Sequence, residues 1–447
     1  MNAGWFDVEI LLRALLLLGL LFVLWAWAAR NLRCLTLGVR RAVAFALGMY
    51  ILTFFAGAAW LFVAQARVVE AYFAGFLPAP DRTPYGLLLM LAALPLVVVP
   101  WAARSAAALL PSASDAADEP GSAPHSSWPV LTAAVVVVAA VFLFNQQLLP
   151  SLLDNALNGI WQSEGLASLY ARREEAFAEL GAAQAGLLYG SLPACAALLL
   201  FAGGQARWLA RALGVMLLVA AVVLNIGLFQ IGPLMAIGLM LVFASIVRRQ
   251  AAVRISWLLA AALAAMLLFA TYQSLKTPEN GGANDAATQA LLRVPIGLPF
   301  LWQFATEEPQ ALSRSDSVSH DLGEFMFPEL RRVERFVSMV QPSFVVTFFQ
   351  HGLLACLAVV VAIGVIAFAG GRALDAAHRS GDPLRPVMVA AVLSPALYYP
   401  FQTQLLDVLV SSYGVLWPAL PVAVALLVQR LGVRPTHPAP ASAAFER

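Results

Sequence analysis

Two residues in the longest polar connection of this chain have side chains suited to proton transfer. They are His320 and Glu324, which lie just upstream of a segment expected to begin a helix at Pro328. A carboxylate or an imidazole can accept or deliver a proton in a reaction on a bound substrate. Glu324 follows a glycine, which would let substrate approach closely. We therefore interpret Glu324 and His320 as a candidate acid/base pair, with Glu324 as the stronger candidate.

Three arginines follow this pair on the expected helix. Proline suits the first turn of a helix because its missing N–H would have no partner there. Beyond Pro328, Arg331 and Arg335 share one face at a spacing of four, and Arg332 adjoins them. They could bind an anion attached to a lipid. The alternative is a helix that lies at the membrane interface with its arginines in water.

A further arginine, Arg293, lies within an apolar stretch over 291–304. A stretch this apolar in a connection either contacts the membrane or packs on the rest of the protein. An arginine within it must find a partner or reach water. Arg293 is therefore either an anchor that extends to the membrane surface or a ligand for an anionic headgroup.

Another pair, Arg172 and Arg173, falls in the connection 150–185, where apolar residues recur at helical spacing. One interpretation is an amphipathic helix in the headgroup region with solvated charges. The other is that a guanidinium binds phosphate or pyrophosphate through two parallel hydrogen bonds. The pattern leaves both open.

The composition excludes a soluble globular protein. Hydrophobic residues make up 61% of the 447 positions and charged residues 12%, against about 25% charged residues in soluble domains. The net charge of +2 does not indicate a nucleic-acid partner. The three cysteines form no metal-binding pattern, and no nucleotide-binding or metalloprotease motif is present. We therefore expect neither a metal nor a cofactor.

Apolar runs of about twenty residues predict a single integral membrane domain over 1–447, an all-α polytopic transmembrane bundle. We expect about eleven spans, within a range of ten to twelve. They lie near 10–29, 42–64, 86–102, 128–149, 186–203, 210–228, 232–247, 255–273, 343–369, 386–401 and 413–429. Pro95 and Pro100 are expected to interrupt the third.

Arginines cluster in alternate connections, which predicts that those connections face the cytoplasm. The Ser-, Ala- and Pro-rich segment 103–127 would then be a flexible cytoplasmic linker and 431–447 a cytoplasmic tail. The connections 150–185 and 274–342 would be periplasmic. The second is the large loop before the third-last span and carries His320 and Glu324.

The order of these features resembles the bacterial oligosaccharide repeat-unit polymerases of the Wzy type, which make O-antigen or capsule. Four stretches carry the resemblance: Tyr170 to Glu175 leading to Leu187 to Pro193, Leu224 to Met235 ending in Arg248 and Arg249, the late loop with Arg293, and Gln341 to Leu354. The resemblance implies a multi-pass protein of the bacterial inner membrane. It also implies a glycosyltransferase-type polymerase that joins repeat units carried on undecaprenyl pyrophosphate into O-antigen, capsular polysaccharide or exopolysaccharide.

The resemblance further implies a flippase and a chain-length regulator as partners, besides the membrane lipid. Outward-facing arginines would stabilise the pyrophosphate as it leaves. Two alternatives remain. An O-antigen ligase would use the same chemistry, whereas a lipid-linked oligosaccharide flippase or secondary transporter would need polar groups in the middle of the bilayer. The expected spans contain few such groups, which favours an enzyme.

Overall fold

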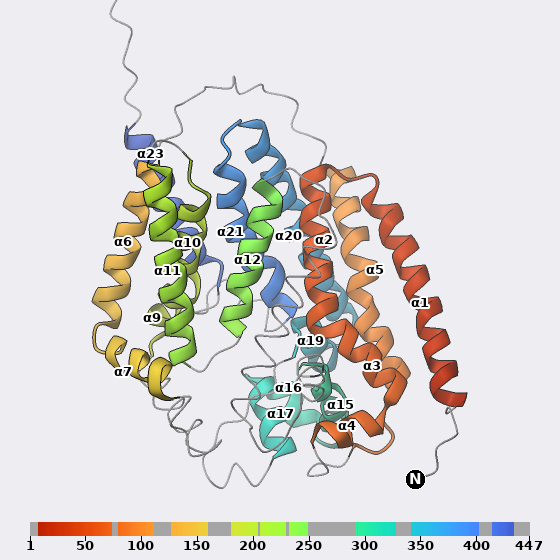
Figure 1. Ribbon diagram of the computed structural model, residues 1–447. Coiled ribbons are helices and arrows are strands. Elements are labelled where there is room, and N and C mark those ends of the chain that lie inside the picture. The colour runs from red at the N-terminus through yellow and green to blue at the C-terminus, as the bar shows by residue number, and fades with distance from the viewer. Residues whose placement is uncertain are drawn as a thin grey trace, which may run out of the picture.

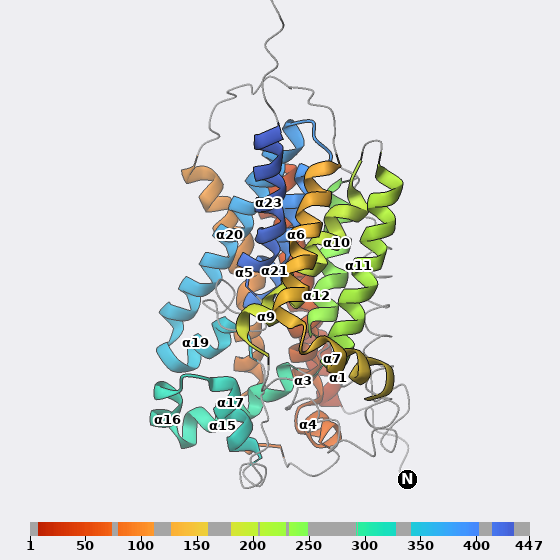
Figure 2. The same ribbon diagram turned by 90° about the vertical axis from the view of Figure 1, so that its left-hand side faces the viewer.

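The structure of this chain is a computed structural model that describes 8–73, 79–110, 127–159, 180–203, 206–228, 232–248, 292, 294–327, 341–401 and 414–432. Every regular element within these ranges is a helix. Long helices stand side by side, and short helices gather at one end of them (Figure 1, Figure 2). The all-α class is therefore confirmed.

Seven helical stretches are long and apolar enough to cross a membrane. Two of them contain a π-helical turn, where one extra residue widens the helix. The seven are α1 (Val8–Leu32), α2 (Leu37–Tyr50) with η1 (Ile51–Phe55) and α3 (Ala56–Ala64), α5 (Tyr85–Leu109), α6 (Trp128–Asn145), α9 (Ala182–Gly186) with η3 (Leu187–Ser191) and α10 (Leu192–Phe201), α11 (Arg207–Gly227) and α20 (Leu353–Arg379). The chain is a helical membrane protein.

Three shorter helices stand among these: α12 (Gly232–Arg248), α21 (Arg385–Tyr398) with η5 (Tyr399–Phe401), and α23 (Leu416–Gly432). With them, helices occupy ten of the eleven ranges expected to span the membrane. The eleventh, 255–273, lies outside the described residues. The number of spans therefore stays a prediction.

The expectation that prolines interrupt the third span is wrong, because α5 continues through both Pro95 and Pro100. A proline removes one backbone hydrogen bond, and in a membrane a neighbouring helix can compensate for the disturbed carbonyls. The indole N–H of Trp27 in α1 donates to Val97 O, 3.1 Å away and three residues before Pro100.

The same helix changes one boundary of the expected linker 103–127. Because α5 ends at Leu109, the first residues of that segment are helical rather than flexible. The remainder of the segment, 111–126, lies outside the described residues.

The expected span 343–369 is two helices, α19 (Ser343–His351) and α20, so its single-span boundaries are wrong. Gly352 separates them with φ of +83°, a backbone conformation that side chains disfavour. The N–H of Gly352 still bonds Phe348 O at 2.9 Å and closes the last turn of α19. The membrane-crossing helix therefore begins later than the sequence pattern indicates.

Short helices collect below the bundle in Figure 1. They are α4 (Ala66–Tyr72), α7 (Leu149–Asp154), η2 (Asn155–Gly159), η4 (Pro295–Gly297), α15 (Leu298–Glu307), α16 (Pro309–Arg314) and α17 (Val318–Met326). We call the three helices α15, α16 and α17 the cap. They come from the connection 274–342 that was expected to form a large loop.

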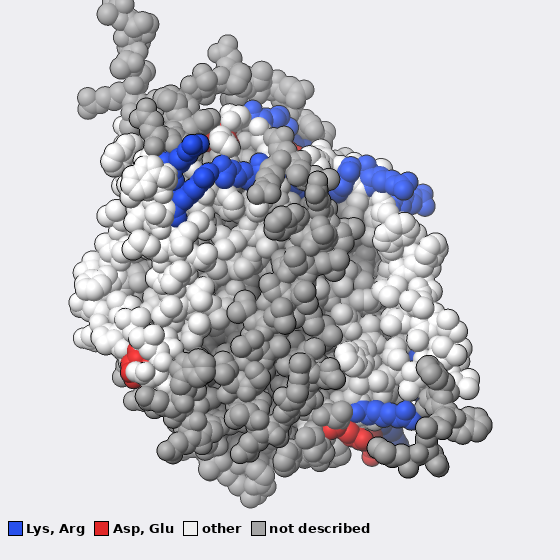
Figure 3. Space-filling model, in the orientation of Figure 1, with Lys and Arg blue, Asp and Glu red and all other residues white. Residues whose placement is uncertain are grey.

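The two ends of the bundle differ in charge among the described residues (Figure 3). One end, called the basic end, carries Arg30, Arg33, Arg40, Arg41, Arg104, Arg207, Arg211, Arg248, Arg372, Arg379, Arg385 and Arg430 against Asp375 and Asp382. The other, called the acidic end, carries Arg13, Arg67, Arg82 and Arg314 against Glu9, Glu70, Asp81, Asp154, Glu307, Glu308, Asp316, Asp321 and Glu324. The cap belongs to the acidic end.

Candidate functional site

Both candidate acid/base residues lie on α17 of the cap. The six arginines expected to bind substrate lie outside the described residues: Arg172, Arg173, Arg293, Arg331, Arg332 and Arg335. Their roles stay predictions. The structure therefore bears on the proton-transfer half of the expected site.

The helix α17 ends at Met326 and precedes the helix expected to begin at Pro328, which lies outside the described residues. Val318, Leu322 and Met326 recur every four residues and are buried, so they form an apolar stripe that holds the helix on the cap. The backbone N–H groups of His320 and Asp321 both bond Ser317 O, at 2.9 and 3.0 Å, and close the first turn. That stripe is the sequence signal that could have revealed the helix.

The side chains of His320 and Glu324 meet on the face of α17 beside this stripe. The Nδ1 atom of His320 is 3.7 Å from Oε1 of Glu324, and the two side chains are 34% and 33% exposed. Their spacing of four places them one helical turn apart. Partial exposure keeps both groups within reach of a substrate, while the buried stripe limits how far they can move.

Aromatic packing holds α17 against the rest of the cap. Phe325 follows Glu324, and the centroid of its ring is 5.0 Å from the ring centroid of Phe304 in α15. The ring of Phe300 in α15 in turn contacts Phe73, which follows α4, with 5.6 Å between centroids and an edge-to-face orientation. The cap thereby contacts the chain just after α4, which follows the membrane stretch of α2, η1 and α3.

Two glutamines tie the cap and the residue Val294 that precedes it to α19 and to the residues just before α19. The amide of Gln350 in α19 donates to Leu312 O and Ser315 O, each at 3.1 Å, and so closes the end of α16. The amide of Gln341, which is 1% exposed, donates to Val294 O at 3.0 Å. A buried polar group is retained where it makes such bonds, so the cap is fixed to the bundle.

The apolar segment 291–304 was expected either to contact the membrane or to pack on the bundle, and its described residues pack on the bundle. Leu298, Leu301 and Phe304 of α15 are at most 3% exposed, and they belong to the same hydrophobic core as the long helices. Gln303, a polar member of that segment, bonds Glu307 at 2.8 Å on the outer side of α15. The segment therefore joins the cap to the hydrophobic core of the bundle.

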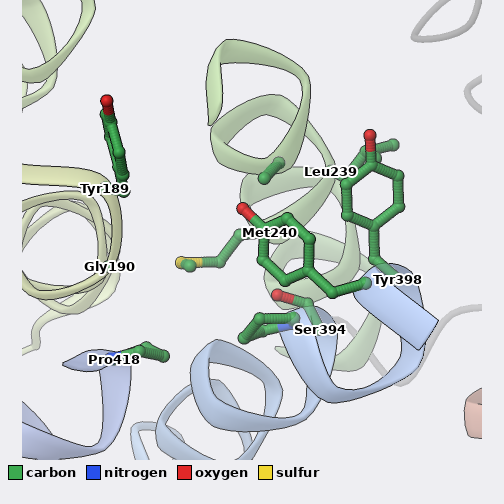
Figure 4. Close-up of a pocket in the computed structure, with 10 residues that line it drawn as sticks. Tyr189, Gly190, Leu239, Met240, Ser394, Tyr398 and Pro418 are labelled. Atoms are coloured by element: carbon green, nitrogen blue, oxygen red, sulfur yellow. The ribbon is translucent and has the colours of Figure 1, made fainter. Parts of the chain in front are cut away.

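The structure also shows a cleft that the sequence patterns did not reveal. Tyr189 from η3 and Tyr398 from α21 line it from opposite sides, with Met240 of α12 between them (Figure 4). Ser394 and Tyr399 add polar atoms. Because the lining residues are up to 229 positions apart, from Tyr189 to Pro418, no local pattern could have indicated the cleft.

This cleft is narrow in the present conformation. Its cavity volume is about 10 Å³. That is room for about one water molecule. A sugar or a lipid headgroup would enter only if the surrounding helices moved apart.

No family model, curated protein or solved structure matches this chain. The functional assignment therefore depends on the residues and their geometry.

Proposed function

We propose that this chain is an inner-membrane polymerase that joins oligosaccharide repeat units carried on undecaprenyl pyrophosphate. The observation that carries this proposal is the His320–Glu324 pair on the cap. The pair is partly exposed, lies on a helix whose neighbouring face is buried, and is located at one end of an apolar helical bundle. A lipid-linked substrate would remain in the membrane while its sugar reaches this end.

The pair would serve the acceptor sugar. A hydroxyl oxygen of the incoming repeat unit would attack the anomeric carbon of the growing glycan, and Glu324 would accept the hydroxyl proton. The bond from the anomeric carbon to the pyrophosphate oxygen breaks, and the pyrophosphate leaves with the electron pair. His320, 3.7 Å from the carboxylate, would orient Glu324 and balance its charge when protonated.

The leaving pyrophosphate would be bound by arginines of the same connections. Arg293, Arg331, Arg332 and Arg335 belong to the connection that contains the cap, and Arg172 and Arg173 to the connection 150–185. Guanidinium groups suit this role because they bind two phosphate oxygens at once. The charge that develops in the transition state would be stabilised there.

The charge difference between the ends supports the orientation in this proposal. Short connections rich in arginine remain in the cytoplasm, so the basic end would face the cytoplasm and the cap the periplasm. Repeat units exported by a flippase would meet the cap on that side. A chain-length regulator would act on the product there.

Reconstitution tests the proposed reaction. Purified protein in nanodiscs would be incubated with a mass-tagged lipid-linked repeat unit, and products would be measured by mass spectrometry. Ladders of two or more repeats on one lipid are expected. Transfer onto lipid A core instead would indicate an O-antigen ligase, and an unchanged substrate would contradict both transferase proposals.

One observation favours the alternative of a flippase or secondary transporter. The cleft places the polar groups of Tyr189, Ser394 and Tyr398 among the long helices of the bundle. A transporter needs such polar groups between its membrane helices. In liposomes, movement of the tagged lipid across the bilayer with no new glycosidic bond would support this alternative against the polymerase.

A further inference from the structure

A groove between α1 and α5 lies at the basic end, far along the bundle from the cap. It is lined by Trp27, Arg30 and Asn31 of α1 and by Trp101, Arg104 and Ser105 of α5. Its cavity volume is about 310 Å³, against about 10 Å³ for the cleft lined by Tyr189 and Tyr398. The groove is wide enough for a small headgroup.

A buried asparagine organises the polar wall of this groove. Asn31 is 2% exposed, and its amide N–H donates to Trp27 O at 2.9 Å. Its amide oxygen accepts a bond from Nη1 of Arg104 at 3.3 Å. Trp27 is held in turn by its own bond to Val97 O. The guanidinium of Arg104 is therefore positioned by α1 rather than free in solution.

Within the described part of the chain, the groove carries positive charge that no carboxylate pairs with. Arg30 and Arg104 both line it, and neither forms an ion pair with a carboxylate in the described part of the chain. Asp375, an acid of the same end, is bonded instead to Thr36 and Gly38. Two neighbouring guanidinium groups repel each other, so the groove favours an anion that can bond both.

The surroundings indicate that this anion belongs to a lipid. Trp101 is 48% exposed and lines the groove, as expected of tryptophan at a membrane surface. In the most apolar stretch of α1 only 6% of the residues are buried, so this helix exposes most of its length to lipid. A headgroup in the groove could therefore extend its acyl chains along α1.

We propose that this groove binds the phosphate of an anionic phospholipid in the leaflet at the basic end, through Arg30 and Arg104. Basic pockets between membrane helices are suited to such headgroups. The bound lipid would fasten α1 to α5. This inference is independent of the proposed polymerase activity, because the groove and the cap lie at opposite ends of the bundle.

Native mass spectrometry of the purified full chain tests this site. The probe is phosphatidylglycerol, compared with phosphatidylcholine and with inorganic phosphate. The test variant is Arg30→Gln with Arg104→Gln. The matched control is Arg207→Gln with Arg211→Gln, which removes the same charge from exposed positions of α11 at the same end, beside the exposed Trp208.

We expect wild type and the α11 control to retain phosphatidylglycerol in preference to phosphatidylcholine. The groove variant should lose roughly a hundredfold or more in phosphatidylglycerol binding, since each of the two charged hydrogen bonds removed is worth roughly tenfold or more. Trp101→Ala, which leaves the charge unchanged, should also weaken phosphatidylglycerol binding. This variant replaces the double variant in the test if the double variant does not fold.

Three results would each overturn the proposal. The first is equal loss in both double variants, which would mean that only total charge matters. The second is equal retention of the two lipids by wild type. The third is displacement of phosphatidylglycerol by millimolar inorganic phosphate, which would identify a site for the free anion.

Discussion

Gly371 of α20 lies directly against the backbone of Val39 in α2. A β-carbon at position 371 would be 2.2 Å from the Cα of Val39, closer than non-bonded atoms can approach. Small residues allow membrane helices to pack this closely, and such packing contributes much of their association. The contact joins the second membrane stretch to α20, which also packs on α5 and α21.

Gly371→Ala should therefore destabilise the protein by about 1–3 kcal/mol, because the backbone of α2 must move away. Unfolding in detergent with increasing denaturant would measure the change. Gly48→Ala in α2 is the matched control, since a β-carbon there meets nothing within 4 Å. Equal stability of the two variants would contradict the close packing.

Asp375 of α20 stabilises the first turn of α2 across the same interface. Its Oδ1 accepts the N–H of Gly38 at 2.8 Å and its Oδ2 accepts the hydroxyl of Thr36. The first N–H groups of a helix need such acceptors, and a negative charge there is favoured. Asp375→Ala should cost about 1–3 kcal/mol and Asp375→Asn less, measured by the same unfolding experiment. A larger loss for Asn than for Ala would show that the carboxylate does not act as a cap.

Glu324→Gln should abolish polymer formation without loss of the folded protein. The amide keeps the shape of the side chain but cannot accept the proton, and general base catalysis contributes roughly 10²–10⁴-fold. Chain extension in nanodiscs would be compared with Asp321→Asn, a neighbouring partly exposed acid on α17. Extension by Glu324→Gln at the wild-type rate would remove this carboxylate from the reaction.

His320→Gln should have a smaller effect on the same assay. The imidazole is proposed to orient Glu324 from 3.7 Å rather than to contact the reacting atoms. Its loss should reduce the rate by about fivefold at most, the size of a partly exposed ion pair. A loss as large as that of Glu324→Gln would reassign the base to His320.

Arginine at positions 172 and 173 should not be replaceable by lysine if either residue binds pyrophosphate through two parallel bonds. Lysine keeps the charge but cannot make that paired contact. Polymer length from each lysine variant would be read on a gel after checking expression. Normal long chains from both variants and from their combination would support an interfacial helix with solvated charges.

The acidic end should be accessible from the periplasm. In a chain whose three cysteines are replaced, Ser313→Cys on exposed α16 should react with an impermeant maleimide in intact cells. Ser380→Cys at the basic end should react only after the membrane is opened. The reverse pattern would invert the proposed orientation and exclude a periplasmic cap.

The membrane class and most helix positions could be predicted from the sequence. Apolar runs of about twenty residues are local in the sequence, and the bilayer thickness sets their length. The placement of arginines is local as well, because short basic loops are retained in the cytoplasm. The helix boundaries around Gly352 and Pro95 could not be derived this way. Whether a helix continues or ends at these positions depends on the packing of neighbouring helices, which can also donate hydrogen bonds to the carbonyls that a proline leaves unbonded.

For the candidate site, the sequence by itself determined that His320 and Glu324 share a polar connection suited to proton transfer. Only the tertiary structure decided that a buried stripe of α17 presents them together, 3.7 Å apart, on a cap fastened by Gln341 and Gln350. Contacts such as the one from Gln341 to Val294 join residues 47 positions apart. Such pairs have no periodicity along the chain, because they are selected by the packing of whole helices rather than by local conformational preference.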